Sequence, residues 1–312
     1  MIYTITLNPA RDRTVVIPDF QAGKVNRIES LRDDPGGKGI NVSKTIRTLG
    51  GKSVAMGILG GAAGKYLRKC LNEIGIPNDF VQTGSETRTN MKVVDPVNHV
   101  TTDINEPGHP VSKRVLTSVF SKLCASAKPG DIAVFAGRIP AGASETLLAD
   151  WTKKLNAAGI RVFLDADGAA LAAGVKAAPY LIKPNDAELK QLLGVSFSSL
   201  SEIYAGARRV IDSTGISYVV VSLGADGALF VNEKVSFRGE GLKVRVMSTV
   251  GAGDSMMAAM AYGFDTGMPL KDVCRLAMAA SASSILTAGT ECAPLETITE
   301  LLAQTKVSVY LG

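Results

Sequence analysis

The sequence predicts an α/β protein with a mainly parallel central sheet, helices on both faces of that sheet and a small β-sheet lid from the N-terminal third. Three observations point to this fold class. Short apolar runs alternate with longer helical stretches in the C-terminal part of the chain, strand-like segments without helices follow one another in the N-terminal third, and two glycine-rich motifs precede helix-like segments. Repeated strand and helix imply parallel strands covered on both faces.

The predicted strands of the main sheet are short, rich in β-branched or aromatic residues and bounded by turn residues, over 132–136, 161–165, 180–183 and 218–222. Helical spacing predicts helices over 145–158, 186–193 and 202–212. Ligands of such sheets bind beyond the carboxyl ends of the strands. The polar residues that close the strands are therefore candidates for ligand contacts: Gly137, Arg138, Asp165, Asp167, Lys183, Asn185, Ser222 and Gly224.

The N-terminal third alternates in the manner of strands over 14–18, 27–32, 89–94 and 100–104, and residues 1–7 also read as a strand. The four segments predict a small antiparallel layer that stands off the main sheet, with one face left to cover something. A lid over a substrate and a surface for a second subunit both fit. No repeat or linker divides the chain, so we expect one domain over 1–312, with lid strands from 13–34 and 87–107.

Composition excludes several classes of protein. The chain has 312 residues, 46% of them hydrophobic and 20% charged, and a net charge of +5 spread along the sequence. Aromatic residues make up 5% and no basic stripe is present, so nucleic acid is not an expected partner. No apolar run reaches the ~18 residues that span a bilayer, and the start of the chain does not read as a signal peptide. We expect no membrane partner.

The cysteines and histidines are few. The four cysteines lie far apart without metal-like spacing, which is typical of reduced thiols in a cytoplasmic protein: Cys70, Cys124, Cys274 and Cys292. The two histidines, His99 and His109, lie near predicted turns. So few histidines argue against a histidine-based catalytic triad and against a histidine-rich metal site.

The most informative motif runs from Ser248 to Ser255 and precedes an apolar, helix-like segment. Its glycines, Gly251 and Gly253, let the backbone turn tightly and leave the amides accessible. A helix N-terminus adds free N–H donors and a positive dipole end, which together favour a phosphate. Asp254 would repel that anion, unless it takes a proton from a hydroxyl that attacks the phosphorus. The alternative is a glycine turn in which Asp254 caps the helix.

The second motif runs from Pro35 to Ser43 and precedes a predicted helix over 41–49. A backbone without side chains can lie flat against a sugar, and the amide of Asn41 offers both a donor and an acceptor to sugar hydroxyls. Lys38 could bind a phosphate, although the spacing is not that of a Walker loop. The alternative is a glycine-rich entry to a packed helix.

Together these motifs resemble the ribokinase-like sugar kinases, the PfkB carbohydrate kinase family, and most of all its branch of bacterial 1-phosphofructokinases and tagatose-6-phosphate kinases. The resemblance runs nearly end to end. It rests on Thr6-Leu7-Asn8-Pro9-Ala10-Arg11-Asp12, Gly36-Gly37-Lys38-Gly39-Ile40-Asn41, Thr87-Arg88-Thr89-Asn90-Met91-Lys92, Ile104-Asn105-Glu106-Pro107-Gly108, Lys183-Pro184-Asn185-Asp186-Ala187-Glu188, Ser222-Leu223-Gly224-Ala225-Asp226-Gly227-Ala228 and Gly251-Ala252-Gly253-Asp254.

The resemblance implies a role for each matching residue on the sugar side. Asp254 would be the catalytic base, and the amides of Gly251, Ala252 and Gly253 the anion hole for the transferring phosphoryl group. The residues implied to bind the phosphosugar are Asp12, Gly36, Gly37, Lys38, Asn41, Arg88 and Lys24. Among these, Arg88 would hold the sugar phosphate, since an arginine fork binds phosphate in a bidentate way. Lys24 would reach a neighbouring subunit's sugar phosphate, or else is a solvated lid lysine.

On the nucleotide side the resemblance implies ATP and Mg²⁺. The residues implied to bind ATP are Lys183, Asn185, Ser222, Gly224, Gly227, Thr249 and Ser281. Asn185 and Glu188, three residues apart on one helix face, would hold Mg²⁺ mainly through water. Ser281 would lie beside the adenine, although its stretch also reads as a plain buried helix. A homodimer formed through the lid is also expected.

One departure from the family pattern concerns the substrate. Relatives carry Ser-Gly-Ser before the proline, where this chain has Ala136-Gly137-Arg138-Ile139-Pro140. Arg138 would add charge at the substrate rim and is a candidate for phosphate binding. The resemblance implies phosphorylation of fructose 1-phosphate, with tagatose 6-phosphate or fructose 6-phosphate as alternative substrates. A phosphosugar sensor without turnover is the alternative from another class, against which the intact Gly251, Gly253 and Asp254 argue.

Overall fold

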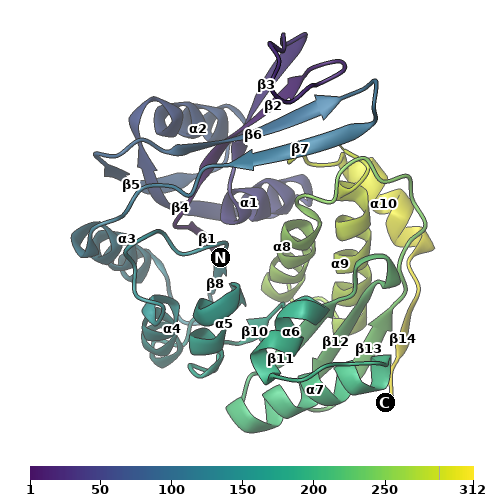
Figure 1. Ribbon diagram of the computed structural model, residues 1–312. Coiled ribbons are helices and arrows are strands. Elements are labelled where there is room, and N and C mark those ends of the chain that lie inside the picture. The colour runs from purple at the N-terminus through teal and green to yellow at the C-terminus, as the bar shows by residue number, and fades with distance from the viewer. Residues whose placement is uncertain (288) are drawn as a thin grey trace.

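The computed structural model describes residues 1–287 and 289–312. Its main body is a 10-stranded sheet in the order β14-β13-β12-β11-β10-β9-β8-β1-β4-β5 (Figure 1). Neighbouring strands from β5 to β11 pair in parallel, and β12, β13 and β14 add an antiparallel edge. The predicted fold class, a mainly parallel sheet with helices on both faces and a separate small sheet, is confirmed.

The strands of the main sheet are β1 (Ile2–Thr6), β4 (Ser53–Gly60), β5 (Asn78–Thr83), β8 (Ile132–Ala136), β9 (Arg161–Asp165), β10 (Leu181–Ile182), β11 (Tyr218–Ser222), β12 (Ala228–Asn232), β13 (Ser236–Gly239) and β14 (Val307–Val309). The helices are α1 (Lys38–Thr48), α2 (Gly61–Glu73), α3 (Lys113–Ser126), α4 (Leu147–Ala157), α5 (Gly168–Val175), α6 (Asp186–Leu193), α7 (Leu200–Thr214), α8 (Ala252–Asp265), α9 (Leu270–Ser284) and α10 (Leu295–Gln304), with a 3₁₀ turn η1 at Gly224–Asp226.

The predicted strands over 132–136, 161–165 and 218–222 match β8, β9 and β11, while β10 is shorter than expected. The N-terminal third contributes more to the main sheet than the sequence suggested. Its strands β1, β4 and β5 extend the parallel sheet, and α1 and α2 connect them. The alternation of strand and helix therefore begins near the start of the chain and not only in its C-terminal part.

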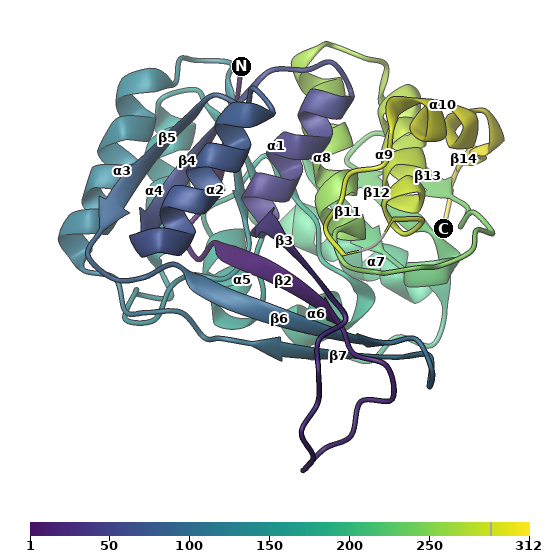
Figure 2. The same ribbon diagram turned by 90° about the horizontal axis from the view of Figure 1, so that it is seen from above.

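The small sheet contains β2 (Ala10–Val16), β3 (Ser30–Gly36), β6 (Arg88–Asp95) and β7 (Val100–Asn105), in the order β3-β2-β6-β7 (Figure 2). Its outer pairs are antiparallel, but the central pair of β2 and β6 is parallel, so the prediction of an antiparallel layer is wrong there. Between β3 and β6 the chain passes through α1, β4, α2 and β5. This long crossover returns β6 in the direction of β2.

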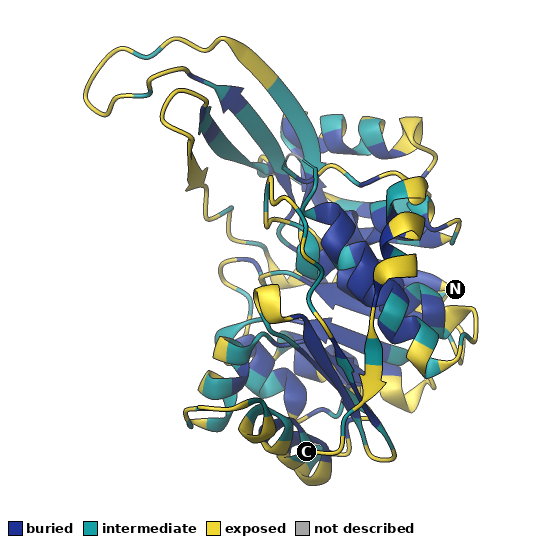
Figure 3. Ribbon diagram, turned by 90° about the vertical axis from the view of Figure 1, so that its right-hand side faces the viewer, coloured by how far each residue is buried: buried dark blue, intermediate teal, exposed yellow. Residues whose placement is uncertain are grey.

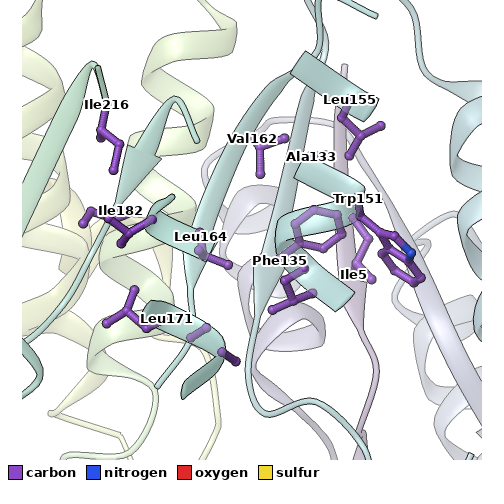
Figure 4. Close-up of a cluster of buried hydrophobic side chains, with 14 of the residues drawn as sticks. Ile5, Ala133, Phe135, Trp151, Leu155, Val162, Leu164, Leu171, Ile182 and Ile216 are labelled. Carbon is purple, nitrogen blue, oxygen red and sulfur yellow. The ribbon is translucent and has the colours of Figure 1, made fainter. Parts of the chain in front are cut away.

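Two hydrophobic clusters cover the two faces of the main sheet. Successive residues of β8 alternate between them: Ala133 and Phe135 pack on one face, Ile132 and Val134 on the other. Figure 4 shows the first cluster, in which Trp151 of α4 lies beside Phe135. Helices α8, α9 and α10 supply much of the second cluster. In contrast, the loop between β2 and β3 projects from the body and is largely exposed (Figure 3).

Candidate active site

The predicted anion site lies at the N-terminus of α8. The helix begins at Ala252, with Gly251 as its N-cap in the left-handed conformation (φ 87°), which a glycine adopts without strain. Asp254 therefore lies inside the first turn and does not cap the helix, which excludes the alternative drawn from the sequence. The first amides of a helix have no partner within it, so the N–H groups of Ala252 and Gly253 can donate hydrogen bonds to an anion.

Asp254 is buried, with 5% of its surface exposed, and it contacts the second glycine motif directly. The amide of Asn41, on α1, donates a hydrogen bond of 2.9 Å to Oδ2 of Asp254. The sequence predicted both residues but not this contact. The Oδ1 atom of Asn41 is buried and has no hydrogen-bond partner among the described residues. A buried, unpaired amide oxygen beside a carboxylate is suited to a hydroxyl donor.

The surroundings of Asp254 raise the pKa of its carboxyl. Burial raises the pKa of Asp254 from its ordinary 3.8 to about 6, partly opposed by the positive charge of Lys38. Asp165 raises this pKa further, whereas the Asn41 hydrogen bond and Lys183 lower it. A carboxylate with a pKa near neutrality is ionised at physiological pH and is a better proton acceptor than an ordinary aspartate.

A cavity of about 320 Å³ lies between the small sheet and the main body. Of the predicted residues, those that line it are Asp12, Gly37, Lys38, Arg88, Gly137 and Arg138. Asp254 is not among the described residues that line the cavity. Lys38 does line it, and the charge of Lys38 acts on the Asp254 carboxylate. Thr6, Thr290 and Arg88 each carry a buried polar atom that lacks a hydrogen-bond partner among the described residues. Such atoms mark a site built for a polar ligand.

Asp12 lies on β2 and points into this cavity. Its Oδ1 accepts a hydrogen bond of 2.9 Å from the amide of Asn90, its direct partner on β6. Burial raises the pKa of Asp12, while the Asn90 hydrogen bond and the charge of Arg88 lower it. Gly36 makes room for this carboxylate, because a Cβ at residue 36 would lie 2.0 Å from Oδ2 of Asp12. The predicted Asp12 and Gly36 are thus in contact.

Two guanidinium groups line the same cavity. Arg88 donates to the carbonyl oxygens of Glu106 (2.7 Å) and Asn8 (3.3 Å) and to Oδ1 of Asn90 (3.2 Å). Burial and the nearby charge of Arg138 lower the pKa of Arg88. Arg138 is exposed and its Nε donates a 3.1 Å hydrogen bond to Asp167. Two like charges that converge on one cavity are suited to an anion with more than one negative charge.

Lys38 and Lys183 both pair with Asp165, which closes β9. The Nζ of Lys38 lies 3.1 Å from Oδ1 of Asp165, and the Nζ of Lys183 lies 3.2 Å from Oδ2. Burial opposes the charge on Lys38, but Asp165, Asp254 and Glu188 raise the pKa of Lys38 above its ordinary value. The structure thus joins a lysine of the sugar-side motif to one of the nucleotide-side motif, and both lie near Asp254.

Asn185 and Glu188 form a capping box at the start of α6. Oδ1 of Asn185 accepts from the Glu188 amide, and Oε2 of Glu188 accepts from the Asn185 amide, each at 2.8 Å. Mg²⁺ is usually bound by one or two carboxylates, waters and substrate phosphates. The charge of Glu188 raises the pKa of Lys38, so this carboxylate lies near enough to act on the site. The donor set therefore fits a magnesium ion bound largely through water, and the described residues contain no cluster of three metal ligands.

The other predicted residues are more scattered. Ser222 ends β11 and forms a parallel bridge with Asn185, and Gly224 begins η1. Gly227 allows close approach of the chain at residues 239–241, since a Cβ there would lie 2.2 Å from the Gly239 oxygen. Thr249 precedes α8 and is exposed, and Ser281 lies half-buried on α9. Among the described residues, no side-chain hydrogen bond or ion pair joins Thr249 or Ser281 to the rest of the site. Lys24 lies in the exposed loop between β2 and β3, away from the cavity lining.

The sequence indicated no role for Asn90, and it marked Asp165 only as a candidate ligand contact at the end of a strand. Asn90 lies two residues after Arg88 in a strand, so the period of two could have placed both on one face. For Asp165, the pairing with two lysines was not predicted. Its contacts with two lysines from separate motifs depend on the sheet topology.

This fold and this site define an α/β phosphotransferase that acts on small polar molecules. The chain matches the family described as "pfkB family carbohydrate kinase" over residues 3–298, and it belongs to that family. It is 35% identical over 312 residues, covering 100% of this chain and 99% of the relative, to a protein of Haemophilus influenzae named 1-phosphofructokinase.

The similarity extends to solved structures. The phosphofructokinase-2 of Escherichia coli in complex with fructose-6-phosphate has a TM-score of 0.92 and 28% identity, covering 97% of this chain and 98% of that one. A structure of the same enzyme described as a tetrameric inhibited form has a TM-score of 0.91 and 29% identity, with the same coverage. This protein is accordingly a sugar-phosphate kinase, a transferase with ATP as a substrate. None of its described helices has the length and apolar character needed to cross a membrane.

Proposed function

We propose that this protein transfers the γ-phosphoryl group of ATP to the 6-hydroxyl of fructose 1-phosphate, giving fructose 1,6-bisphosphate and ADP. The observation that carries the proposal is the lining of one cavity by Asp12, suited to sugar hydroxyls, and Arg88, suited to a phosphate. A sugar that is already phosphorylated satisfies both groups. The full-length relative named 1-phosphofructokinase supports the choice of this sugar phosphate.

In the proposed reaction Asp254 is the general base. The acceptor hydroxyl attacks the γ-phosphorus in line, Asp254 takes its proton, and ADP leaves with the electrons of the broken P–O bond. The hydrogen bond from Asn41 orients the carboxylate and leaves its second oxygen for the hydroxyl. The amides of Gly251, Ala252 and Gly253 stabilise the charge of the transferring group. General-base help of this kind typically contributes ~10²–10⁴-fold.

Charge on the nucleotide side is neutralised by Lys183, whose ammonium lies beside Gly253. Mg²⁺, held by Glu188 with Asn185 and water, would neutralise charge on the phosphates of ATP. Ser222, Gly224, Gly227, Thr249 and Ser281 are proposed to line the ATP cleft. For Gly227 a packing role is also supported, because the backbone at residues 239–241 leaves no space for a side chain.

The sugar is held mainly from the small sheet. Asp12, with Gly36, Gly37 and Asn41, binds the hydroxyls, and Lys38 lies at the reacting end. Arg88 and Arg138 hold the phosphate at the other end. Asp167 pairs with Arg138 in the present structure, so an incoming phosphate competes with that carboxylate for the guanidinium.

We also propose that the chain is one kinase domain over 1–312, in which the small sheet is a lid that forms a homodimer. Exposed apolar side chains on the lid support this, among them Ile28, Leu31 and Ile104. Lys24 would then reach the sugar phosphate of a neighbouring subunit from its projecting loop. Light scattering that detects only monomer at micromolar concentration would refute the dimer. The unpaired state of all four cysteines supports a cytoplasmic location.

A coupled assay of ADP release tests the proposed substrate. It compares fructose 1-phosphate, tagatose 6-phosphate, fructose 6-phosphate and unphosphorylated fructose at matched concentrations. We expect the highest kcat/KM with fructose 1-phosphate. A higher kcat/KM with fructose 6-phosphate or tagatose 6-phosphate would mean that the sugar binds in the opposite orientation, with its 1-hydroxyl at Asp254. Binding of a phosphosugar without any ADP release would mean that the protein is a phosphosugar sensor and not a kinase.

A further inference from the structure

Asp165 has no role in the reaction described so far, although it lies at the centre of the charged site. It is the last residue of β9 and only 3% of its side chain is exposed. Its two carboxylate oxygens face two different ammonium groups, those of Lys38 and Lys183, at 3.1 and 3.2 Å. Burial would raise the pKa of Asp165, but the two lysines hold it below the usual range. Asp165 is therefore ionised between two cations.

The two lysines face the two halves of the proposed reaction. Lys38 lines the sugar cavity. Lys183 lies against the anion site, because its Nζ would be only 3.1 Å from a Cβ at Gly253. Both charges act on Asp254 and lower its pKa, whereas the charge of Asp165 raises it. One carboxylate thus connects the acceptor side, the donor side and the base.

We propose that Asp165 is a positioning residue that holds the ammonium groups of Lys38 and Lys183 on opposite sides of the transferring phosphoryl group. This inference rests on the proposed kinase reaction. A lysine ammonium sits on a flexible four-carbon stem, and two such groups repel each other when they approach one anion. A carboxylate fixed at the end of a strand offsets that repulsion and limits the motion of both stems, so the positive charge is in place before the phosphates arrive.

The charges that face Asp254 give a test that does not depend on turnover. They come from Lys38 at the start of α1, Asp165 at the end of β9 and Lys183 after β10, and Asn41 adds a neutral hydrogen bond. In Asp165→Asn a negative neighbour disappears and both ammonium groups are released toward Asp254. Each change favours the ionised form, so the pKa of Asp254 should fall from about 6 by about one unit.

The measurement is a ¹³C NMR titration of the Asp254 carboxyl in the ligand-free protein, with the signal assigned by its loss in Asp254→Asn. The matched control is Asp212→Asn, which removes an aspartate paired with Arg208 on α7, outside the site. We expect the control to titrate like the wild type. An unchanged titration in Asp165→Asn would overturn the inference, because a carboxylate that only stabilises the fold does not set the charge at Asp254.

Kinetics supply the second readout. In Asp165→Asn we expect kcat to fall at least about tenfold, with KM for ATP and for the sugar phosphate changed less, because the lysines lose their fixed positions in the transition state. The acid limb of the kcat/KM profile should move to lower pH with the base. A variant whose only defect is a greater requirement for Mg²⁺ would assign Asp165 to the metal instead and overturn the proposal.

A further variant keeps the test valid if Asp165→Asn does not fold. Lys38→Met removes a cation from a half-exposed side chain, and it should raise the pKa of Asp254 and move the acid limb upward. Absence of that shift would contradict the charge coupling. If the wild type phosphorylates none of the sugars, the proposed function fails, yet the titrations still report whether Asp165 and Lys38 set the charge at Asp254.

Discussion

The amide of Asn41 donates a 2.9 Å hydrogen bond to the carboxylate of Asp254, although the two residues are 213 positions apart in the chain. Both are buried, and each lies within the first turn of the helix that follows its glycine motif. The contact joins the proposed sugar-binding motif to the proposed base. In the proposed reaction, a sugar hydroxyl bound by Asn41 would therefore lie next to the group that takes its proton.

Replacement of this base should abolish most of the activity. In Asp254→Asn the amide keeps the shape of the side chain and can still accept from Asn41, but it cannot take a proton. We expect kcat to fall at least ~10²-fold, with KM for fructose 1-phosphate little changed. Steady-state ADP release measures the effect, and a circular dichroism spectrum like that of the wild type is the control. Turnover near the wild-type value would remove Asp254 from its role.

The pH dependence of the wild type should report the same carboxyl. Asp254 must be ionised to act as a base, so kcat/KM should rise with pH and level off above about 6. An aspartate with an ordinary pKa would keep the enzyme almost fully active down to about pH 5. The profile is measured under conditions where the sugar phosphate does not itself change charge, or is corrected for that titration. A flat profile between pH 5 and 7 contradicts the raised pKa.

Asp254 should also weaken the folded state at neutral pH. Its carboxyl has a pKa of about 6 when folded and an ordinary 3.8 when unfolded, so the unfolded chain ionises more readily. The loss of stability is absent below pH 3.8, grows as pH rises from 3.8 to about 6 and is complete above about 6. At pH 8 Asp254→Asn should be more stable than the wild type, by about 3 kcal/mol.

Urea unfolding of both proteins at several pH values measures this difference in the free energy of unfolding. The gap should close as pH falls toward 4. A variant less stable than the wild type at pH 8 would mean that the carboxylate is well solvated or fully paired in the folded state.

Loss of the guanidinium of Arg88 should weaken sugar-phosphate binding. In Arg88→Ala we expect KM for fructose 1-phosphate to rise at least about tenfold, because charge-assisted hydrogen bonds to the phosphate disappear, while KM for ATP stays the same. Arg13→Ala is the matched control: Arg13 lies in the same sheet but pairs with Asp33 and does not line the cavity. An unchanged KM in Arg88→Ala argues against a phosphate at this position.

Gly36 should be required by its neighbour Asp12. In Gly36→Ala the new methyl group would lie 2.0 Å from Oδ2 of Asp12, so the carboxylate must move. We expect KM for the sugar phosphate to rise at least about tenfold through this displacement. Gly84→Ala is the control, because a Cβ there meets no atom within 4 Å and the backbone is in an ordinary conformation. Equal kinetics in the two variants would mean that Asp12 does not hold the sugar.

Much of this arrangement could be predicted from local sequence. Asp254 and Asn41 follow glycine motifs that mark helix starts, and the strands β8, β9 and β11 appear as short apolar runs with clear boundaries. These features depend on backbone freedom and on the alternation of burial, both of which are visible in a few neighbouring residues.

The rest depends on long-range pairing. Asn90 reaches Asp12 because β2 and β6 are parallel and pair Asp12 with Asn90, and a layer assumed to be antiparallel hides this contact. Asp165 reaches two lysines only because β8, β9 and β10 are adjacent in the sheet and α1 begins nearby. In the same way, the asparagine and glutamate of the predicted magnesium site also form a helix cap, which a motif match does not distinguish from metal binding.

The chain path at Gly37 ties the small sheet closely to α1. Strand β3 ends at Gly36 and α1 begins at Lys38, so a single residue separates the edge of the small sheet from the helix that carries Asn41. A Cβ at Gly37 would lie 2.7 Å from the side chain of Thr6, so this junction packs closely against β1. The small sheet is thus joined to the first turn of α1 with no loop between them. In the proposed reaction, the strand that borders the sugar and the helix that orients Asp254 are therefore one continuous stretch of main chain.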